Sequence, residues 1–173
     1  YHPGDAYQES KVEGEKLVLA YNSLGKISVR IIRPAMIYGP GDTRLLKLFK
    51  GVAEGRFFYV GAGNALVHFI DVRDLAEAFR LAAITPDIDG EIFIIAGQTC
   101  LPLREVVDML SALFGVKPPW LHLPVKLMQT LGSICEVVCA PFGITPPLYR
   151  RRVDFFTKNR SFDCSKAHTL LGF

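Results

Sequence analysis

Hydrophobic positions follow two different spacings along the chain, and the change between them predicts strands and helices in turn. Short apolar runs rich in β-branched residues predict strands at 26–33, 57–60, 66–70 and 91–96. Helical spacing predicts helices at 5–24, from 42 or 43 to 54, at 72–83, 102–114 and 149–156, and from 162 to the end. Strands that alternate with helices are typical of an α/β fold with a parallel sheet.

Residues that favour the ends of elements support several of these boundaries. Asp5 and Asp71 are expected to cap helices, Gly25 and Gly115 to end them, and Pro34 to end the first strand. The stretch 38–42 has the composition of a loop. Two helices have a predicted core face. In the first it consists of Leu75, Ala76, Phe79 and Ala83, and in the second of Val106, Val107, Leu110 and Phe114.

Composition narrows the class of protein. Of the 173 residues, 50% are hydrophobic and 21% are charged, which is typical of a folded globular protein and argues against disorder. A net charge of +3 is too small to indicate nucleic-acid binding. No uninterrupted apolar run reaches the roughly 20 residues of a membrane-spanning helix. The histidines and cysteines lack metal-ligand spacing, so no metal site is expected, and the cysteines are expected to be reduced, as in the cytoplasm.

Two segments near the C-terminus leave alternatives open. The strongly apolar stretch 123–142 fits ordinary core, a wall beside an apolar substrate, or a peripheral contact with a membrane surface. Arg150, Arg151 and Arg152 fit a solvated helix face or a contact with an anionic substrate or cofactor.

Tyr7 and Lys11 are the pair that indicates chemistry. Their four-residue spacing places both side chains on one face of a helix, one turn apart. A phenol is a weak base near neutral pH, because its pKa is about 10, and a nearby ammonium favours the phenolate. A Tyr and a Lys at this spacing are also common on any amphipathic helix, so the pair alone does not identify an enzyme.

The surrounding motifs resemble the extended short-chain dehydrogenase/reductase family, which includes NAD-dependent epimerases and dehydratases and 3β-hydroxysteroid dehydrogenase-like enzymes. Its pattern is similar to Tyr7-x-x-Ser10-Lys11, to the segment 33–42 (RPAMIYGPGD), and to 69–76 (FIDVRDLA). Further matches follow in order at 90–97 (GEIFIIAG) and at 163–173 (DCSKAHTLLGF). The resemblance implies the C-terminal part of a Rossmann-type, doubly wound parallel sheet together with a smaller, mixed substrate-binding region.

The resemblance also implies roles for individual residues. Tyr7 would be the general acid/base and Lys11 would hold the nicotinamide ribose of NAD or NADP, while Pro34, Ala35 and Ile37 would line the nicotinamide pocket. Met36 stands where nucleotide-sugar enzymes of the family typically have Asn, and Val67 where they often have Arg. Losing these polar partners of a diphosphate favours an apolar substrate beside Met36, Val67 and Phe69.

The first hypothesis is therefore an NAD(P)-dependent oxidoreductase that acts on a secondary alcohol or ketone of a sterol- or flavonol-like molecule. A nucleotide-sugar epimerase or dehydratase, and a non-catalytic fragment or pseudoenzyme, are the alternatives. Residues 1–60 are expected to belong to the dinucleotide-binding domain and 61–173 mainly to the substrate region, with strand 91–96 returning to the Rossmann sheet. The family's glycine-rich loop and catalytic Ser/Thr precede its Tyr, so residues 1–173 alone are expected to be inactive. The family also allows a homodimer.

Overall fold

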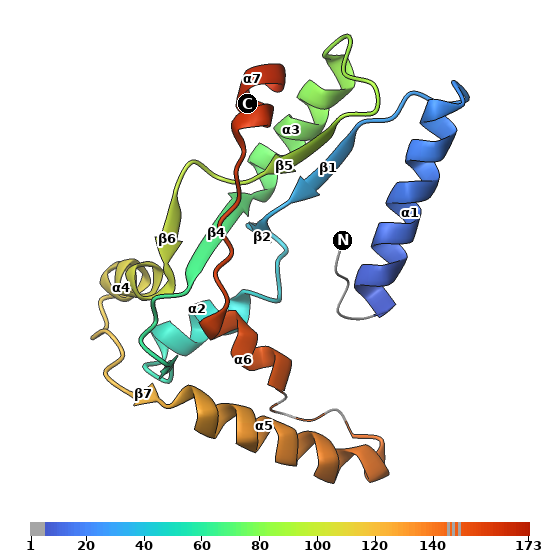
Figure 1. Ribbon diagram of the computed structural model, residues 1–173. Coiled ribbons are helices and arrows are strands. Elements are labelled where there is room, and N and C mark those ends of the chain that lie inside the picture. The colour runs from blue at the N-terminus through green and yellow to red at the C-terminus, as the bar shows by residue number, and fades with distance from the viewer. Residues whose placement is uncertain (1–5, 145, 147, 149) are drawn as a thin grey trace. The chain divides into compact units, whose positions relative to one another are not determined.

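The computed structural model describes residues 6–144, 146, 148 and 150–173 (Figure 1). The chain forms two compact units, and each draws on segments far apart in the sequence. The first unit contains residues 1–39, 70–97 and 162–173, and the second contains 40–69 and 98–161. The expected division at residue 60 concerns which ligand each part binds, so it stays a prediction.

The first unit contains a parallel strand pair and three described helices. These elements are α1 (Ala6–Ser23), β1 (Ile31–Pro34), β2 (Met36–Tyr38), α3 (Val72–Ile84), β5 (Ile92–Ile95) and α7 (Ser165–Leu171). β1 and β5 run parallel, with Ile31 opposite Ile92 and Pro34 opposite Ile95. Phe93 and Ile95 alternate with half-buried neighbours along β5, so one face of this strand enters the core. Side chains of α3 and α7 complete that core, through Leu75, Ala78, Ala82, Ala167 and Leu171.

The second unit is a mixed assembly of short strands and helices. Its elements are α2 (Leu46–Ala53), β3 (Tyr59–Val60), β4 (Leu66–Asp71, which continues into the first unit), β6 (Cys100–Pro102), α4 (Leu103–Phe114), β7 (His122–Leu123), α5 (Val125–Cys139), the 3₁₀ helix η1 (Ala140–Phe142) and α6 (Arg150–Thr157). β3 pairs parallel with β7, and β4 pairs antiparallel with β6 in a sheet of order β2-β4-β6. Its largest core cluster consists of Leu48, Val52, Tyr59, Val67, Leu103 and Val107.

Several element boundaries differ from the sequence-based expectation. The first strand begins at Ile31 rather than at residue 26, and Pro34 is its last residue. Part of the expected loop at 38–42 belongs to β2, which ends at Tyr38. The helix expected from residue 42 or 43 begins only at Leu46, because the Asp42 carboxylate accepts the N–H groups of Arg44 and Leu45 (2.9 and 3.1 Å) and closes a turn first. The expected cap at Asp5 lies outside the described residues.

Two predicted core faces need correction. On α3 the buried side chains are Leu75, Ala78 and Ala82, whereas Phe79 is exposed. The expected face was therefore right at Leu75 and wrong at Ala76, Phe79 and Ala83, which point away from the core. On α4 the core contacts come from Leu103 and Val107, with Val106 and Leu110 half-buried and Phe114 exposed.

Helix caps were predicted correctly where a polar side chain or a glycine sets them. The Asp71 carboxylate accepts the N–H of Arg73 at 2.8 Å and so caps α3, and Gly115 ends α4 in the left-handed conformation. Asp71 also contacts the Arg73 guanidinium at 2.9 Å. These hydrogen bonds to the ionised form lower the pKa of Asp71 to about 2.

Replacing Asp71 is expected to change how stability depends on pH. A carboxyl whose pKa is lower in the folded state stabilises that state above its unfolded value, and loses this effect as the pH falls. Asp71→Asn, which keeps a capping oxygen, is expected to flatten the acid-induced loss between about pH 4 and pH 2. Asp71→Ala is expected to lower the melting temperature further, by about 2–4 °C. Thermal melts across this pH range check both predictions. An equal loss of stability on acidification in Asp71→Asn and wild type would contradict the expected pH dependence.

Candidate functional site

Tyr7 and Lys11 lie one turn apart on α1, as their spacing predicts. The Lys11 ammonium nitrogen is 5.5 Å from the centre of the Tyr7 ring. The Tyr7 side chain is 70% exposed, so its hydroxyl can be reached by a small molecule. Ser10 bonds back to the Tyr7 carbonyl at 2.8 Å and stays within the helix.

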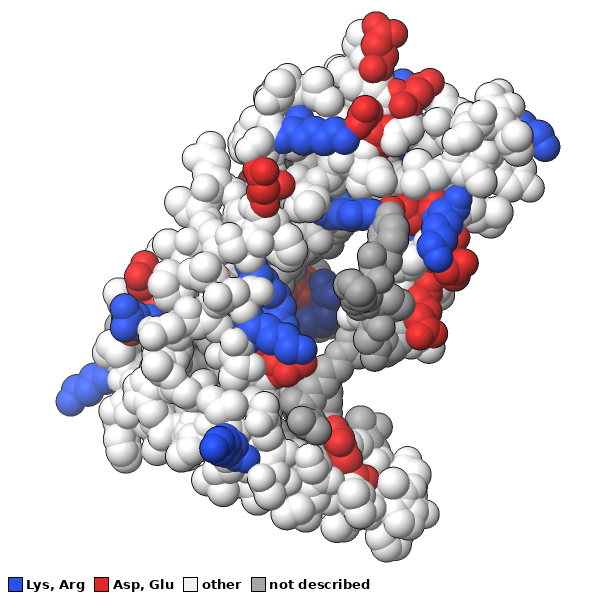
Figure 2. Space-filling view, viewed as in Figure 1, with Lys and Arg blue, Asp and Glu red and all other residues white. Residues whose placement is uncertain are grey.

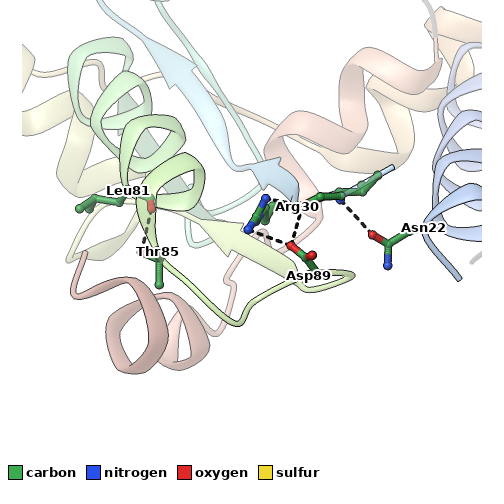
Figure 3. A network of polar contacts seen from close by, with 7 residues as sticks. Asn22, Arg30, Leu81, Thr85 and Asp89 are labelled. Carbon is green, nitrogen blue, oxygen red and sulfur yellow. Dashed lines mark hydrogen bonds and ion pairs between the residues drawn. The ribbon is translucent and has the colours of Figure 1, made fainter. Parts of the chain in front are cut away.

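α1 is held in place by polar contacts rather than by a buried face, because none of its described residues is buried. Near its C-terminal end the Asn22 side chain accepts the N–H of Val29 at 2.9 Å. Arg30 in turn forms an ion pair with Asp89 at 2.8 Å, in the loop before β5 (Figure 3). This network ties the end of α1 to the chain that leads into β1.

A second contact lies on the face of α1 that carries Tyr7 and Lys11. Glu15, one turn beyond Lys11, forms a bidentate ion pair with Arg33 of β1. In this pair Arg33 Nε donates to Glu15 Oε2 at 2.9 Å. The Glu15 side chain is only 13% exposed. Since Tyr7, Lys11 and Glu15 succeed one another at i, i+4 and i+8, this ion pair orients their common face toward β1. Because 18 positions in the sequence separate Glu15 from Arg33, no local pattern predicts their ion pair.

Residues 34–37 begin with the last residue of β1 and continue beyond its C-terminal end, beside the corresponding end of β5. The Ala35 N–H donates to the Ile95 carbonyl at 2.8 Å, and Ile37 packs against the core of the first unit. Pro34 is exposed. In open α/β sheets ligands bind outside the carboxyl ends of the strands, which is where this segment lies.

The glycine that closes this segment is required by packing as well as by conformation. Gly39 has a φ of +131°, which L side chains rarely adopt. A Cβ built on it would lie 2.8 Å from Cγ1 of Val72, so the chain passes close to the start of α3.

The three expected substrate residues lie in different surroundings. Met36 is half-buried in β2 of the first unit. Val67, in the second unit, has 0% exposure and belongs to the main core cluster there, against which Phe69 also packs. Their role toward a substrate stays a prediction.

The second unit also contains an open cavity of about 460 Å³ around the turn at 61–64. Backbone and side chains of both polar and apolar residues line it, namely Val60 to Ala65, Val125, Phe156, Thr157 and Asn159. Gly61 and Gly63 form the turn with positive φ angles. Within the described part of the chain, no group of three His, Cys, Asp or Glu side chains could hold a metal ion.

A family model matches the first half of the chain. The model is that of the NAD dependent epimerase/dehydratase family, and it covers residues 1–96, which include Tyr7, Lys11 and the segment 34–37. The chain therefore belongs to the NAD-dependent epimerase/dehydratase family, in agreement with the expected family and with NAD or NADP as its cofactor.

Curated relatives and solved structures agree with this assignment. The chain is 30% identical to 3beta-hydroxysteroid-dehydrogenase/decarboxylase isoform 2 of Arabidopsis thaliana, over 98% of this chain and 32% of that protein. It is 29% identical to a decarboxylating sterol-4-alpha-carboxylate 3-dehydrogenase of Schizosaccharomyces pombe, over 96% of this chain and 51% of that protein. The structure of UDP-glucuronic acid 4-epimerase of Bacillus cereus, solved with NAD, superposes with a TM-score of 0.71 at 22% identity. The superposition covers 99% of this chain and 47% of that protein. The α/β, Rossmann-type fold class is confirmed, and the chain spans a third to a half of these proteins.

Proposed function

We propose that the full-length protein carrying this chain is an NAD(P)-dependent oxidoreductase that acts on a secondary alcohol or ketone of an apolar, sterol- or flavonol-like molecule. The observation that carries the proposal is the common face of Tyr7, Lys11 and Glu15, which Arg33 holds against the carboxyl end of β1. Residues 1–60 would serve the cofactor and 61–173 mainly the substrate.

The chain's residues fit a nicotinamide cofactor at this place. Lys11 offers three N–H donors on a helix face that is oriented toward β1, which suits the hydroxyls of a ribose. Pro34, Ala35 and Ile37 would border the ring through their backbone. When bound, the cofactor supplies or accepts the hydride at the substrate carbon.

Tyr7 would move the proton that accompanies the hydride. In reduction its hydroxyl donates a proton to the developing alkoxide, and in oxidation its phenolate takes the proton from the alcohol. The Lys11 ammonium nitrogen lies 5.5 Å from the centre of the Tyr7 ring, on the same face of α1, so one bound molecule can contact both side chains.

An apolar substrate is supported by the side chains that replace polar ones and by the relatives. Met36 and Val67 offer no charge-assisted partner to a diphosphate. Two curated relatives bear names that specify steroid or sterol 3-dehydrogenation. The second candidate is a nucleotide-sugar epimerase or dehydratase, which the likeness to the UDP-glucuronic acid 4-epimerase favours.

A substrate panel tests the proposal. The full-length protein is incubated with NADH or NADPH and hydrophobic ketones, and in parallel with UDP- and dTDP-sugars. Turnover of the ketones is expected. Turnover of sugar nucleotides alone would favour the second candidate, and no turnover of either would favour a non-catalytic protein.

The Glu15–Arg33 ion pair gives a sharper test of how the site is positioned. Glu15→Gln is expected to lower kcat/KM about tenfold with a small loss of thermal stability, because the amide keeps the shape of the side chain but loses the charge-assisted contact that orients Tyr7 and Lys11. Glu13→Gln is the matched control, since Glu13 pairs with Lys16 on the same helix but both side chains are exposed. Equal losses for the two variants would contradict the positioning role.

We also propose a cytoplasmic location and a homodimer in which α1 takes part. The four cysteines, all described, are free thiols, which suits a reducing compartment.

The homodimer is supported by exposed apolar side chains. Leu17 lies on α1 and Leu24 just after it, and both suit a contact between copies.

A further inference from the structure

α5 and η1 present an apolar surface that the second unit does not cover. Leu127, Leu131, Ile134 and Val138 follow one another at i+4, i+3 and i+4 and form a single exposed stripe along α5. Val137, Phe142 and Ile144 extend this stripe and are exposed as well. From Leu127 to Phe142 it is about 22 Å long at helical rise. Figure 2 shows the segment labelled α5 in Figure 1 as mostly white. These seven residues are called the α5 stripe below.

A neighbouring side of α5 packs against the rest of the second unit. Met128 and Gly132 are buried there, and Met128 joins Val60 and Val153 in a core cluster that connects α5 to α6 and β3. By length and composition, Val125–Phe142 is the one stretch among the described helices that could cross a membrane. Because one side is packed against α6, however, α5 offers only its other side to an apolar medium. This arrangement is typical of a helix that lies on a lipid surface.

The part of the sequence that contains α5 is basic, which favours an anionic partner. Residues 117–160 contain seven Lys and Arg but only two Asp and Glu, so this stretch carries +5 whereas the whole chain carries +3. Two copies docked through the stripe would bring two such positive stretches together, which disfavours self-association. An anionic surface gains from the same charge.

An exposed tryptophan precedes the helix. Trp120, five positions before α5, is 85% exposed, the largest exposed fraction among the large hydrophobic side chains described. Tryptophan is enriched where membranes meet water, because its ring is apolar and its N–H is polar. An exposed tryptophan, an exposed apolar stripe and a basic stretch of sequence are three features of a surface-binding segment.

We propose that the α5 stripe docks this protein on the surface of a bilayer that contains anionic lipids. The stripe would lie at the level of the headgroups, parallel to the surface. The proposal concerns location and does not depend on the reaction proposed above, since vesicle binding is measured without cofactor or substrate.

Flotation of the full-length protein with vesicles tests the proposal. Wild type is expected to float with vesicles of phosphatidylcholine and phosphatidylserine, and less with phosphatidylcholine alone or at high salt. Leu131→Ser/Ile134→Ser/Val138→Ser is expected to weaken binding at least about tenfold, since three half-exposed apolar side chains are lost. Met109→Ser/Leu113→Ser, which removes two exposed apolar side chains from α4, is the matched control and is expected to bind as wild type does.

Folding is checked by circular dichroism melts of all three proteins, and oligomeric state by sedimentation. Wild type that fails to float would overturn the proposal, as would equal binding by both variants. Dissociation of an oligomer by the triple substitution, without vesicle binding by wild type, would also overturn it and identify the stripe as a contact between copies.

Discussion

Tyr7→Phe in the full-length protein is expected to lower kcat by about 10²–10⁴-fold while leaving cofactor affinity nearly unchanged. The substitution removes only the hydroxyl that transfers the proton, and the ring stays 5.5 Å from the Lys11 ammonium. Because the Tyr7 side chain is largely exposed, its hydroxyl contributes little to folding. Steady-state kinetics together with calorimetric titration of the cofactor separate the two effects.

The same helix offers a control of matching chemistry. Tyr21 lies near the other end of α1, and the Lys26 ammonium is 5.4 Å from its ring. Tyr21→Phe is expected to keep the full rate, since Tyr21 lies 14 residues from Tyr7, about 21 Å along the helix axis. A Tyr7→Phe enzyme that retains most of its rate would refute the role proposed for Tyr7.

Phe93→Ala is expected to have the largest effect on stability, about 3–5 kcal/mol in the free energy of unfolding. Phe93 has 0% exposure and lies at the middle of β5, where the parallel pair with β1 meets α3 and α7. Truncation leaves a cavity that the surrounding Ile70, Leu75 and Ile95 cannot fill. Urea unfolding monitored by circular dichroism gives the difference.

Phe79→Ala serves as the control in the same unit. Its ring is 54% exposed on α3, so its loss is expected to cost less than about 1 kcal/mol. Similar losses for the two variants would show that the core of the first unit is not centred on β5, contrary to the structure.

Local signals in the sequence were sufficient for the longer elements. The apolar spacing, the Asp71 cap and the glycine at 115 predicted α3 and α4 within one or two residues of their ends. β3 lies within the strand predicted at 57–60, whereas β7 was not predicted. β7 has only two residues, too few for a period, and it exists because His122 pairs with Tyr59, 63 positions earlier. Such strands depend on tertiary contacts that no local pattern contains.

In the candidate site too, contacts within one helix could be predicted from the sequence and contacts between elements could not. Tyr7 and Lys11 could be predicted because one helical turn joins them, whereas the Glu15–Arg33 ion pair links separate elements and became visible only in the structure. The apolar stretch 123–142 was recognised, but its sequence could not show which side is covered. The structure buries Met128 and leaves Leu131 and Ile134 exposed.

The central claim is that this protein transfers a hydride between a nicotinamide and an apolar alcohol or ketone, with Tyr7 moving the proton. Reduced cofactor that carries deuterium at both C4 positions of the nicotinamide is the probe, with a sterol-like ketone as substrate and mass spectrometry of the product. Wild type is expected to give product with one deuterium on the carbinol carbon, and Tyr7→Phe is expected to form almost no product. Unlabelled product, or equal amounts of labelled product from the two proteins, would contradict the claim.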